Sequence, residues 1–213
     1  MLNNFMEHVY HVKQYQPFQF HHDYDAVCEH FHQTVVIHHG YAIVTAASNK
    51  NRSNANALHA MICSNDLLTK HGFHILKWEN QTLTSDDVID EFRFYLLDHM
   101  WQWEKRFFAM VLEHFNNRVS EGRVLTQHNS IKILIGKIVT TLSMTQETIF
   151  SSKTSQTQLY RPDLLLLAAN NIKQIALDLH QLAGGRAFVQ GNIIEMHCLF
   201  EIFRKVYFQG RTI

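Results

Sequence analysis

Two short stretches of the chain carry residue types that could turn the backbone or contact another group. "QLAGGRAFVQGN", residues 181–192, places Gln181 shortly before Gly184 and Gly185, in a chain with only eight glycines. Glycine is costly inside a helix and useful where backbone must turn or lie against another group. In "NRVSEGRVLTQHNS", residues 117–130, Arg118 has a guanidinium group whose forked donors match a phosphate. The alternative is a tight turn between helices, with Gly184 ending one helix and Gln181 an ordinary polar residue.

Sixteen histidines suggest a different chemistry, metal binding, and they cluster in the first half of the chain. His30 and His32 have the His-x-His spacing that places two ligands on one face of a strand, and His8 and His11 would share one face of a helix. No carboxylate-rich or cysteine-rich segment accompanies them. Surface histidines are the alternative interpretation, and no residue is assigned as a metal ligand.

Composition and charge restrict the class of protein. The 213 residues, 46% of them hydrophobic, are enough for one large domain, or for one domain with a small appendage, around a substantial core. Lys plus Arg and Asp plus Glu both number 19, so no net field attracts nucleic acid or an anionic membrane. The longest apolar run, "LLLLAA" at 164–169, is too short to span a bilayer. Three scattered cysteines and the absence of a signal-peptide pattern favour a soluble, cytoplasmic setting.

The predicted secondary structure changes near residue 85, from short strands to long helices. In residues 1–84, "TVVIHHGYAIVTAA" (34–47) predicts two strands around His39-Gly40, "NALHAMICS" and "GFHILKW" predict two more, and "DYDAVCEHFH" predicts a short helix. From 85 to 213 the apolar period is helical and predicts helices over about 85–117, 126–151, 162–183 and 192–208. The fold class is therefore mainly α: a four-helix bundle preceded by a small region with a few strands.

The junctions of this bundle resemble those of the C-terminal domain of acyl-CoA dehydrogenases. Arg118 and Gly122 have the spacing of the family's Arg-x-x-Phe-Gly turn, which follows the first bundle helix. The family's Gln-x-x-Gly-Gly-x-Gly-Phe/Tyr turn corresponds to a run that begins at Gln181. The remaining matches in register are Arg93, His128, Asn129 in place of a glutamine, Gly184, Gly185, Ala187, Phe188 and Glu195. Together they extend over about 60% of the chain.

The resemblance implies a cofactor and an assembly. In the family, the arginine after the first helix pairs with the pyrophosphate of FAD in a neighbouring subunit, and the glycine turn lies against its adenosine end. The residues expected to contact FAD are therefore Arg118, Gln181, Gly184 and Gly185. Family bundles pack against each other, so we expect a homodimer or larger assembly, or a pairing with a full-length paralogue.

Departures from the family pattern concern the catalytic base. The family carries a carboxylate either after the fourth helix, where this chain has Phe208 and Gln209, or on the first helix, where it has Phe92. None of these side chains can remove the α-proton of an acyl thioester. Glu91 is displaced by one residue, about 100° around the helix. Glu121 also replaces the phenylalanine of the Arg-x-x-Phe-Gly turn and places a carboxylate near the expected pyrophosphate.

Three functions follow from these observations. The first is a truncated, degenerate family member without a catalytic base, which serves as a partner subunit and contacts FAD across an interface. The second is a minimal flavin-dependent enzyme that acts on an acyl thioester, carried by coenzyme A or by an acyl carrier protein, with Glu91 as a displaced base. The third is a histidine-rich metal-binding protein built on the same bundle.

Overall fold

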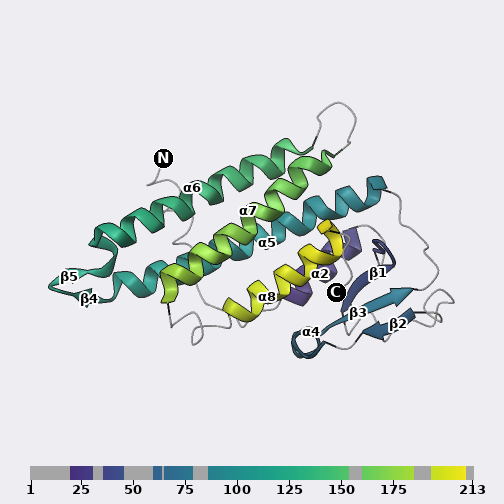
Figure 1. The fold of residues 1–213 in the computed structure, drawn as a ribbon, viewed down its shortest axis with the longest axis horizontal. Coiled ribbons are helices and arrows are strands. Elements are labelled where there is room, and N and C mark those ends of the chain that lie inside the picture. The colour runs from purple at the N-terminus through teal and green to yellow at the C-terminus, as the bar shows by residue number, and fades with distance from the viewer. Residues whose placement is uncertain are drawn as a thin grey trace.

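The computed structural model describes residues 20–30, 36–45, 60–63, 65–78, 86–153, 160–184 and 193–209. Four long helices dominate this part of the chain (Figure 1): α5 (Asp86–Asn116), α6 (Asn129–Ser151), α7 (Pro162–Ala183) and α8 (Ile193–Arg204). A π-helical turn, η4 (Lys205–Gln209), continues α8. The mainly α class and the bundle predicted from the sequence are confirmed, and each helix begins and ends within a few residues of its expected bounds.

Local sequence explains where α7 begins and ends. Pro162 occupies its first turn, where a missing N–H costs nothing, and Asp163 supplies a negative charge at the positive end of the helix dipole. At the other end, Gly184 has a φ of 56°, and its N–H donates to the carbonyl of His180. A residue with a Cβ adopts this backbone conformation only with strain, so the glycine terminates the helix.

The N-terminal part consists of α2 (Phe20–His30), a three-stranded antiparallel sheet and α4 (Asp66–Lys70). The strand order is β1 (Tyr41–Thr45), β3 (Phe73–Trp78), β2 (Ala60–Cys63). The strands predicted in "NALHAMICS" and "GFHILKW" correspond to β2 and β3, whereas α4 was not predicted.

One strand prediction was wrong. Residues 34–47 were expected to form a two-stranded hairpin, but only β1 forms among the residues described. His38 and Tyr41 exchange two backbone hydrogen bonds across a tight turn, and the His38 Nδ1–H donates to the carbonyl oxygen of Val206 at 2.8 Å. This contact ties the segment before β1 to the C-terminal end of the bundle.

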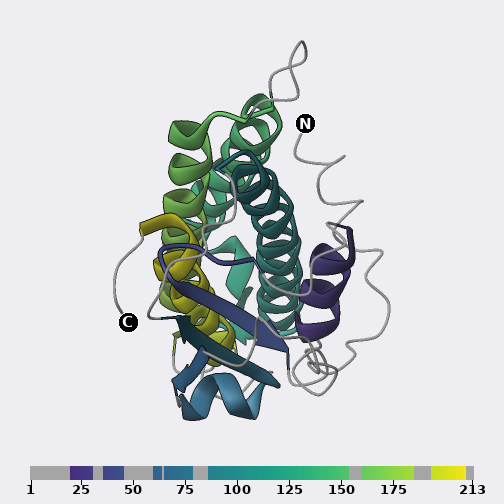
Figure 2. The same ribbon diagram turned by 90° about the vertical axis from the view of Figure 1, so that its right-hand side faces the viewer.

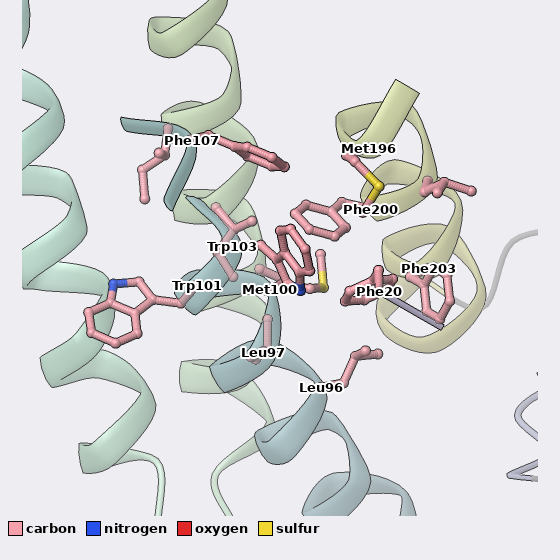
Figure 3. Packing of buried hydrophobic residues seen from close by; sticks show 14 of the residues in the cluster. Phe20, Leu96, Leu97, Met100, Trp101, Trp103, Phe107, Met196, Phe200 and Phe203 are labelled. Carbon is pink, nitrogen blue, oxygen red and sulfur yellow. The ribbon is translucent and has the colours of Figure 1, made fainter. Parts of the chain in front are cut away.

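The larger of two hydrophobic clusters among the described residues joins the N-terminal elements to the bundle, and the smaller, formed by Ala42, Val44, Leu76 and Trp78, lies on the sheet. The ring of Phe20 lies 5.1 to 6.4 Å, between centroids, from the rings of Phe73, Trp103, Phe200 and Phe203. Figure 3 shows Phe20 among the side chains of α5 and α8. The sheet and α2 therefore pack on the bundle, as Figure 2 shows for α2 beside α5. The boundary expected at residue 84 stays a prediction.

Apolar side chains cover most of the circumference of α5, as the sequence predicted, and the chain itself buries them. Phe92, Phe107 and Phe108 are fully buried, and the indole N–H of Trp101 donates to the carbonyl oxygen of Leu142 on α6 at 2.9 Å. The exposed large apolar side chains of the bundle helices lie instead on α6 and α7: Ile133, Met144, Phe150, Leu166, Leu167 and Leu177. No helix in the described ranges is long and apolar enough to cross a membrane.

Candidate functional site

The residues expected to contact FAD lie at one end of the bundle, where α5 and α7 end and α6 begins (Figure 1). Arg118 follows directly after α5 and is exposed, with no side-chain hydrogen bond or ion pair to the described residues. Gln181 is exposed on the last turn of α7. Gly185 lies outside the described residues. The structure thus places Arg118, Gln181 and Gly184 at the same end of the bundle, with both polar side chains exposed.

A short hairpin presents Arg118. Its strands β4 (Val119–Ser120) and β5 (Arg123–Val124) are joined by Glu121 and Gly122, whose φ angles are 54° and 73°. Positive φ at both positions is typical of the tight two-residue turns that match strand twist. His128, matched to a family histidine, lies with its Nε2 3.2 Å from the carbonyl oxygen of Ser120. The side chain of Glu121 is exposed, so its carboxylate can turn toward solvent.

A groove of ≈ 440 Å³ opens between the start of α6 and the end of α7. Gln181 lines it together with Ser130 and Lys137. Next to it, a Cβ added to Gly184 would meet nothing within 4 Å. Among the described residues, the glycine is therefore required by its φ and not by a neighbouring group. Exposed forked donors, an amide beside a groove and an uncrowded glycine fit the pyrophosphate and adenosine parts of FAD.

The positions where a catalytic base was sought have different surroundings. Phe92 is fully buried, and its ring centroid lies 4.8 Å from that of Tyr207 and 6.0 Å from that of Tyr24. Glu91 is half-buried and forms a hydrogen bond with Tyr160. Burial, and then the charge of Glu91, raises the pKa of the Tyr160 hydroxyl to about 12. A partly buried carboxylate with a tyrosine partner thus stands beside an aromatic core.

Two other matched residues hold the fold together. Arg93 donates to the carbonyl oxygen of Tyr207 at 2.5 Å, to Asp90 at 2.6 Å and to His38 Nε2 at 2.8 Å. His38 accepts because it is neutral: burial, the largest cause, lowers its pKa to about 4. Glu195 accepts hydrogen bonds from Lys70 at 2.7 Å and from His71 at 3.0 Å, and thus links α8 to the sheet region.

The sequence interpretation missed a second groove, of ≈ 380 Å³, between α5, α7 and α8. Three of the side chains that line it form a hydrogen-bonded row. Glu104 Oε2 lies 3.0 Å from His197 Nε2, and His197 Nδ1 lies 2.6 Å from His180 Nε2. Glu104 is fully buried and His197 is nearly so, while His180 is half-buried. Burial, and then the neighbouring His197, lowers the pKa of His180.

One signal of this row was present in the sequence. Glu104 stands on the apolar helix α5, four residues after the buried Met100 and three before the buried Phe107. A carboxylate on such a stripe needs a buried partner. The histidines of the described segments do not supply a metal centre: no group of three or more His, Cys, Asp or Glu in these segments could hold a metal ion. His8, His11 and His32, and the side chain of His30, lie outside the described residues.

Comparison with known proteins establishes the fold. No protein-family model matches the chain, and no curated protein matches its sequence. It is similar to the acyl-CoA dehydrogenase from Slackia heliotrinireducens DSM 20476, with a TM-score of 0.54 and 13% identity over 76% of this chain and 47% of that one. It is also similar to the prolyl acyl carrier protein oxidase AnaB, with a TM-score of 0.55 and 10% identity over 82% of this chain and 53% of that one.

These likenesses support the acyl-CoA dehydrogenase fold that the resemblance predicted. The chain spans about half the length of each solved structure. Because residues 85–213 make up only about 60% of the chain, both alignments extend beyond the bundle into the N-terminal region.

Proposed function

We propose that the protein is a partner subunit with an acyl-CoA dehydrogenase fold that contacts FAD across a subunit interface and has no catalytic base of its own. The observation that supports this proposal is the position of Arg118, Gln181 and Gly184 at the same end of the bundle, with both polar side chains exposed. The neighbouring subunit is a second copy of the chain or a full-length paralogue. FAD, when bound, supplies two-electron oxidation chemistry.

Each residue has a distinct role in this proposal. Arg118 donates to the pyrophosphate through its forked N–H groups, in a position where its side chain has no competing partner in the described residues. Gln181 donates or accepts at the groove between α6 and α7. The turn that begins at Gly184 lets backbone approach the adenosine end. Glu121 turns toward solvent to avoid repulsion from the phosphates.

The surroundings of Phe92 support a non-catalytic subunit. A carboxylate is needed within hydrogen-bond reach of the proton that it removes. Phe92 instead fills an aromatic cluster with Tyr24 and Tyr207. Gln209, on the other expected segment, is an exposed amide. Neither of the family's two positions for a base holds a basic group in this chain.

The test is FAD binding by the purified protein, measured from visible absorption and flavin fluorescence, alone and with a full-length paralogue. Arg118→Ala should weaken FAD binding about tenfold or more, because a charge-assisted contact to phosphate is lost. Arg123→Ala is the matched control, since Arg123 is an exposed arginine of the same hairpin outside the motif. Equal FAD affinity in Arg118→Ala and Arg123→Ala would contradict the proposal.

One observation favours a second candidate function, a flavin-dependent oxidase or dehydrogenase of an acyl thioester. Glu91 is half-buried and held by Tyr160 one residue from the family's base position, so it is an ordered carboxylate. One of the similar structures is a prolyl acyl carrier protein oxidase, which makes a thioester on a carrier protein the substrate class to test. FAD-dependent turnover that disappears in Glu91→Gln would select this candidate and exclude the non-catalytic one.

A further inference from the structure

The groove of ≈ 380 Å³ between α5, α7 and α8 has apolar walls. Met100 contributes to the walls from α5, Phe200 from α8, and Ile172 and Ala176 from α7. Among the described residues, it shares no lining side chain with the groove beside Gln181, and none of the residues proposed to contact FAD lines it. A ligand in this groove would therefore bind apart from FAD.

One end of the groove holds the row of Glu104, His197 and His180. His180 of α7 is hydrogen-bonded to His197 of α8, which in turn is hydrogen-bonded to the fully buried Glu104. The carboxylate of Glu104 thus has a partner within the protein. The charge of a ligand therefore depends on the groups at the opposite end.

The opposite end of the groove carries an excess of positive charge. Lys173, Arg204 and Lys205 line it together with the carboxylate of Glu201. Glu201 accepts two hydrogen bonds of 2.7 Å from Arg204, whose side chain is only 6% exposed. Lys173 Nζ lies 3.7 Å from the same carboxylate, and exposed Lys205 has no hydrogen bond or ion pair to the described residues. Three cations thus share one anion at this end, and the excess attracts an anionic group.

The distance between the two ends limits the size of a ligand. Lys173 and His180 are seven residues apart on α7, which is about 10 Å along the helix. His197 and Arg204 have the same separation on α8. An extended octyl chain is of similar length, so one such chain would reach from the cationic end to the row.

We propose that this groove binds a single-chain phosphate monoester. The phosphate lies between the ammonium groups of Lys173 and Lys205, and the hydrocarbon chain runs along Ala176 and Phe200 toward the row. A phosphate monoester carries about −1.5 to −2 charges at neutral pH, which matches the excess at this end better than the single charge of a carboxylate. Each lysine binds phosphate as a point charge, and burial of the chain against apolar walls supplies further affinity.

Isothermal titration calorimetry with hexyl and octyl phosphate, below the concentrations at which they form micelles, tests the proposal. Octyl phosphate should bind about sixteenfold more tightly than hexyl phosphate, because it buries two more methylenes. Octyltrimethylammonium, of the same length and opposite charge, should bind about tenfold more weakly or worse. Octyl sulfate, with one negative charge, should also bind more weakly than octyl phosphate. Equal affinity of octyl phosphate and any of these three compounds would overturn the proposal.

The two exposed lysines provide the decisive variant. Lys173→Gln combined with Lys205→Gln removes both exposed charges and should weaken octyl phosphate about tenfold or more. Arg123→Gln combined with Lys132→Gln is the matched control, because it removes two exposed positive charges outside the groove. Circular dichroism should show that both double variants fold. Equal affinity of the two double variants for octyl phosphate would contradict the proposed position of the phosphate.

The thiol of Cys198 allows the ligand to be located. Cys198 is exposed and lines the groove, whereas Cys63 on β2 is half-buried and does not line it. Saturating octyl phosphate should slow alkylation of Cys198 by N-ethylmaleimide and leave alkylation of Cys63 unchanged, as measured by mass spectrometry of the labelled peptides. An unchanged rate at Cys198 under saturation would place the ligand elsewhere and overturn the proposal.

Discussion

The ring of Phe92 packs against the ring of Tyr207 with centroids 4.8 Å apart, at a position where the resemblance would place a catalytic carboxylate. Phe92 is fully buried, and Tyr24 contacts it from α2. Restoring a carboxylate at residue 92 would therefore bury a charge within an aromatic cluster. Phe92 is therefore part of the aromatic core that connects α2, α5 and η4.

We predict that Phe92→Glu, which puts a carboxylate at one of the family's positions for a base, strongly destabilises the protein. Burial of an unpaired carboxylate and loss of aromatic packing should lower the free energy of unfolding by about 3 kcal/mol or more. Gln209→Glu, at the exposed alternative position, should change it by less than about 0.5 kcal/mol. Urea denaturation followed by circular dichroism measures both. Equal stability of the two variants would contradict this account of Phe92.

The absence of a carboxylate at residues 92 and 209 also leads to a prediction about catalytic activity. The protein alone, saturated with FAD, should show no acyl-CoA dehydrogenase turnover with short-, medium- or long-chain acyl-CoA and an artificial electron acceptor. Displacement of a base by even ~1 Å can cost about a hundredfold, and Glu91 is displaced by one helical residue. Gln209→Glu alone should not restore turnover. Clear turnover that is abolished by Glu91→Gln would show that Glu91 is the base.

Gly184 and Gly136 should respond to alanine in opposite directions. Gly184 has a φ of 56°, so Gly184→Ala should destabilise the protein by about 1 kcal/mol through backbone strain, although nothing crowds the new Cβ. Gly136 lies inside α6 with open space around it, so Gly136→Ala should stabilise the protein by about 0.4–1 kcal/mol. Thermal unfolding should show a lower midpoint than the parent for Gly184→Ala and a higher one for Gly136→Ala, and shifts in the same direction would contradict the prediction.

The bundle was predictable because helix signals are local. Pro162, Gly184 and the apolar period of α5 fix where the chain turns and which faces it buries, whatever the distant contacts. The strand expected before His39 is absent from the described residues of that segment, where His38 instead contacts Val206 and Arg93, which are distant in the sequence. Propensity cannot reveal such partners.

The two groups of candidate site residues differ in the same way: the sequence predicts one group and not the other. Motif spacing identified Arg118 and Gln181, which lie at one end of the bundle because the helices alternate in direction. The row of Glu104, His197 and His180 joins three helices, and its spacing in the sequence follows no pattern. Only the antiparallel packing of α7 and α8 on α5 brings these residues together.

The hydroxyl groups of Tyr24 and Tyr207 should be energetically coupled. They lie 2.9 Å apart, Tyr24 is hydrogen-bonded to the carbonyl oxygen of Ile43 at 2.7 Å, and the Ile43 N–H donates to Tyr207 at 3.0 Å. Tyr207→Phe leaves a buried backbone N–H unsatisfied and should cost about 1–3 kcal/mol. A double-mutant cycle with Tyr24→Phe should give a coupling energy of about 0.5–3 kcal/mol. Strict additivity would show that the network does not join α2 to η4.

Stability should fall as the pH drops from 6.5 to 4. Burial lowers the pKa of His38 from 6.5 to about 4, so the neutral ring is favoured in the folded state. The stability from this shift is fully present above pH 6.5 and is lost as the unfolded chain, but not the folded one, takes up a proton. His38→Gln should remove part of this pH dependence, and His74→Gln serves as a control with one histidine fewer. Unfolding free energies measured across this pH range should show a shallower slope for His38→Gln only.

We expect self-association through the outer face of α6 and α7. The apolar side chains of α5 are covered within the chain, whereas Leu166 and Leu177 are 40% and 53% exposed on α7, and Ile133 is 74% exposed on α6. Leu166 and Leu177 are eleven residues apart and therefore lie on one face of the helix. Such a face on a bundle is typical of a surface that a partner covers.

Leu166→Glu combined with Leu177→Glu should convert a dimer or larger assembly to monomer at micromolar concentration, as measured by light scattering. Gln102→Glu, exposed on α5, should leave the mass unchanged. A monomeric parent protein at that concentration would contradict both the interface and the proposal that FAD is shared between two copies of this chain, and would leave a full-length paralogue as the partner.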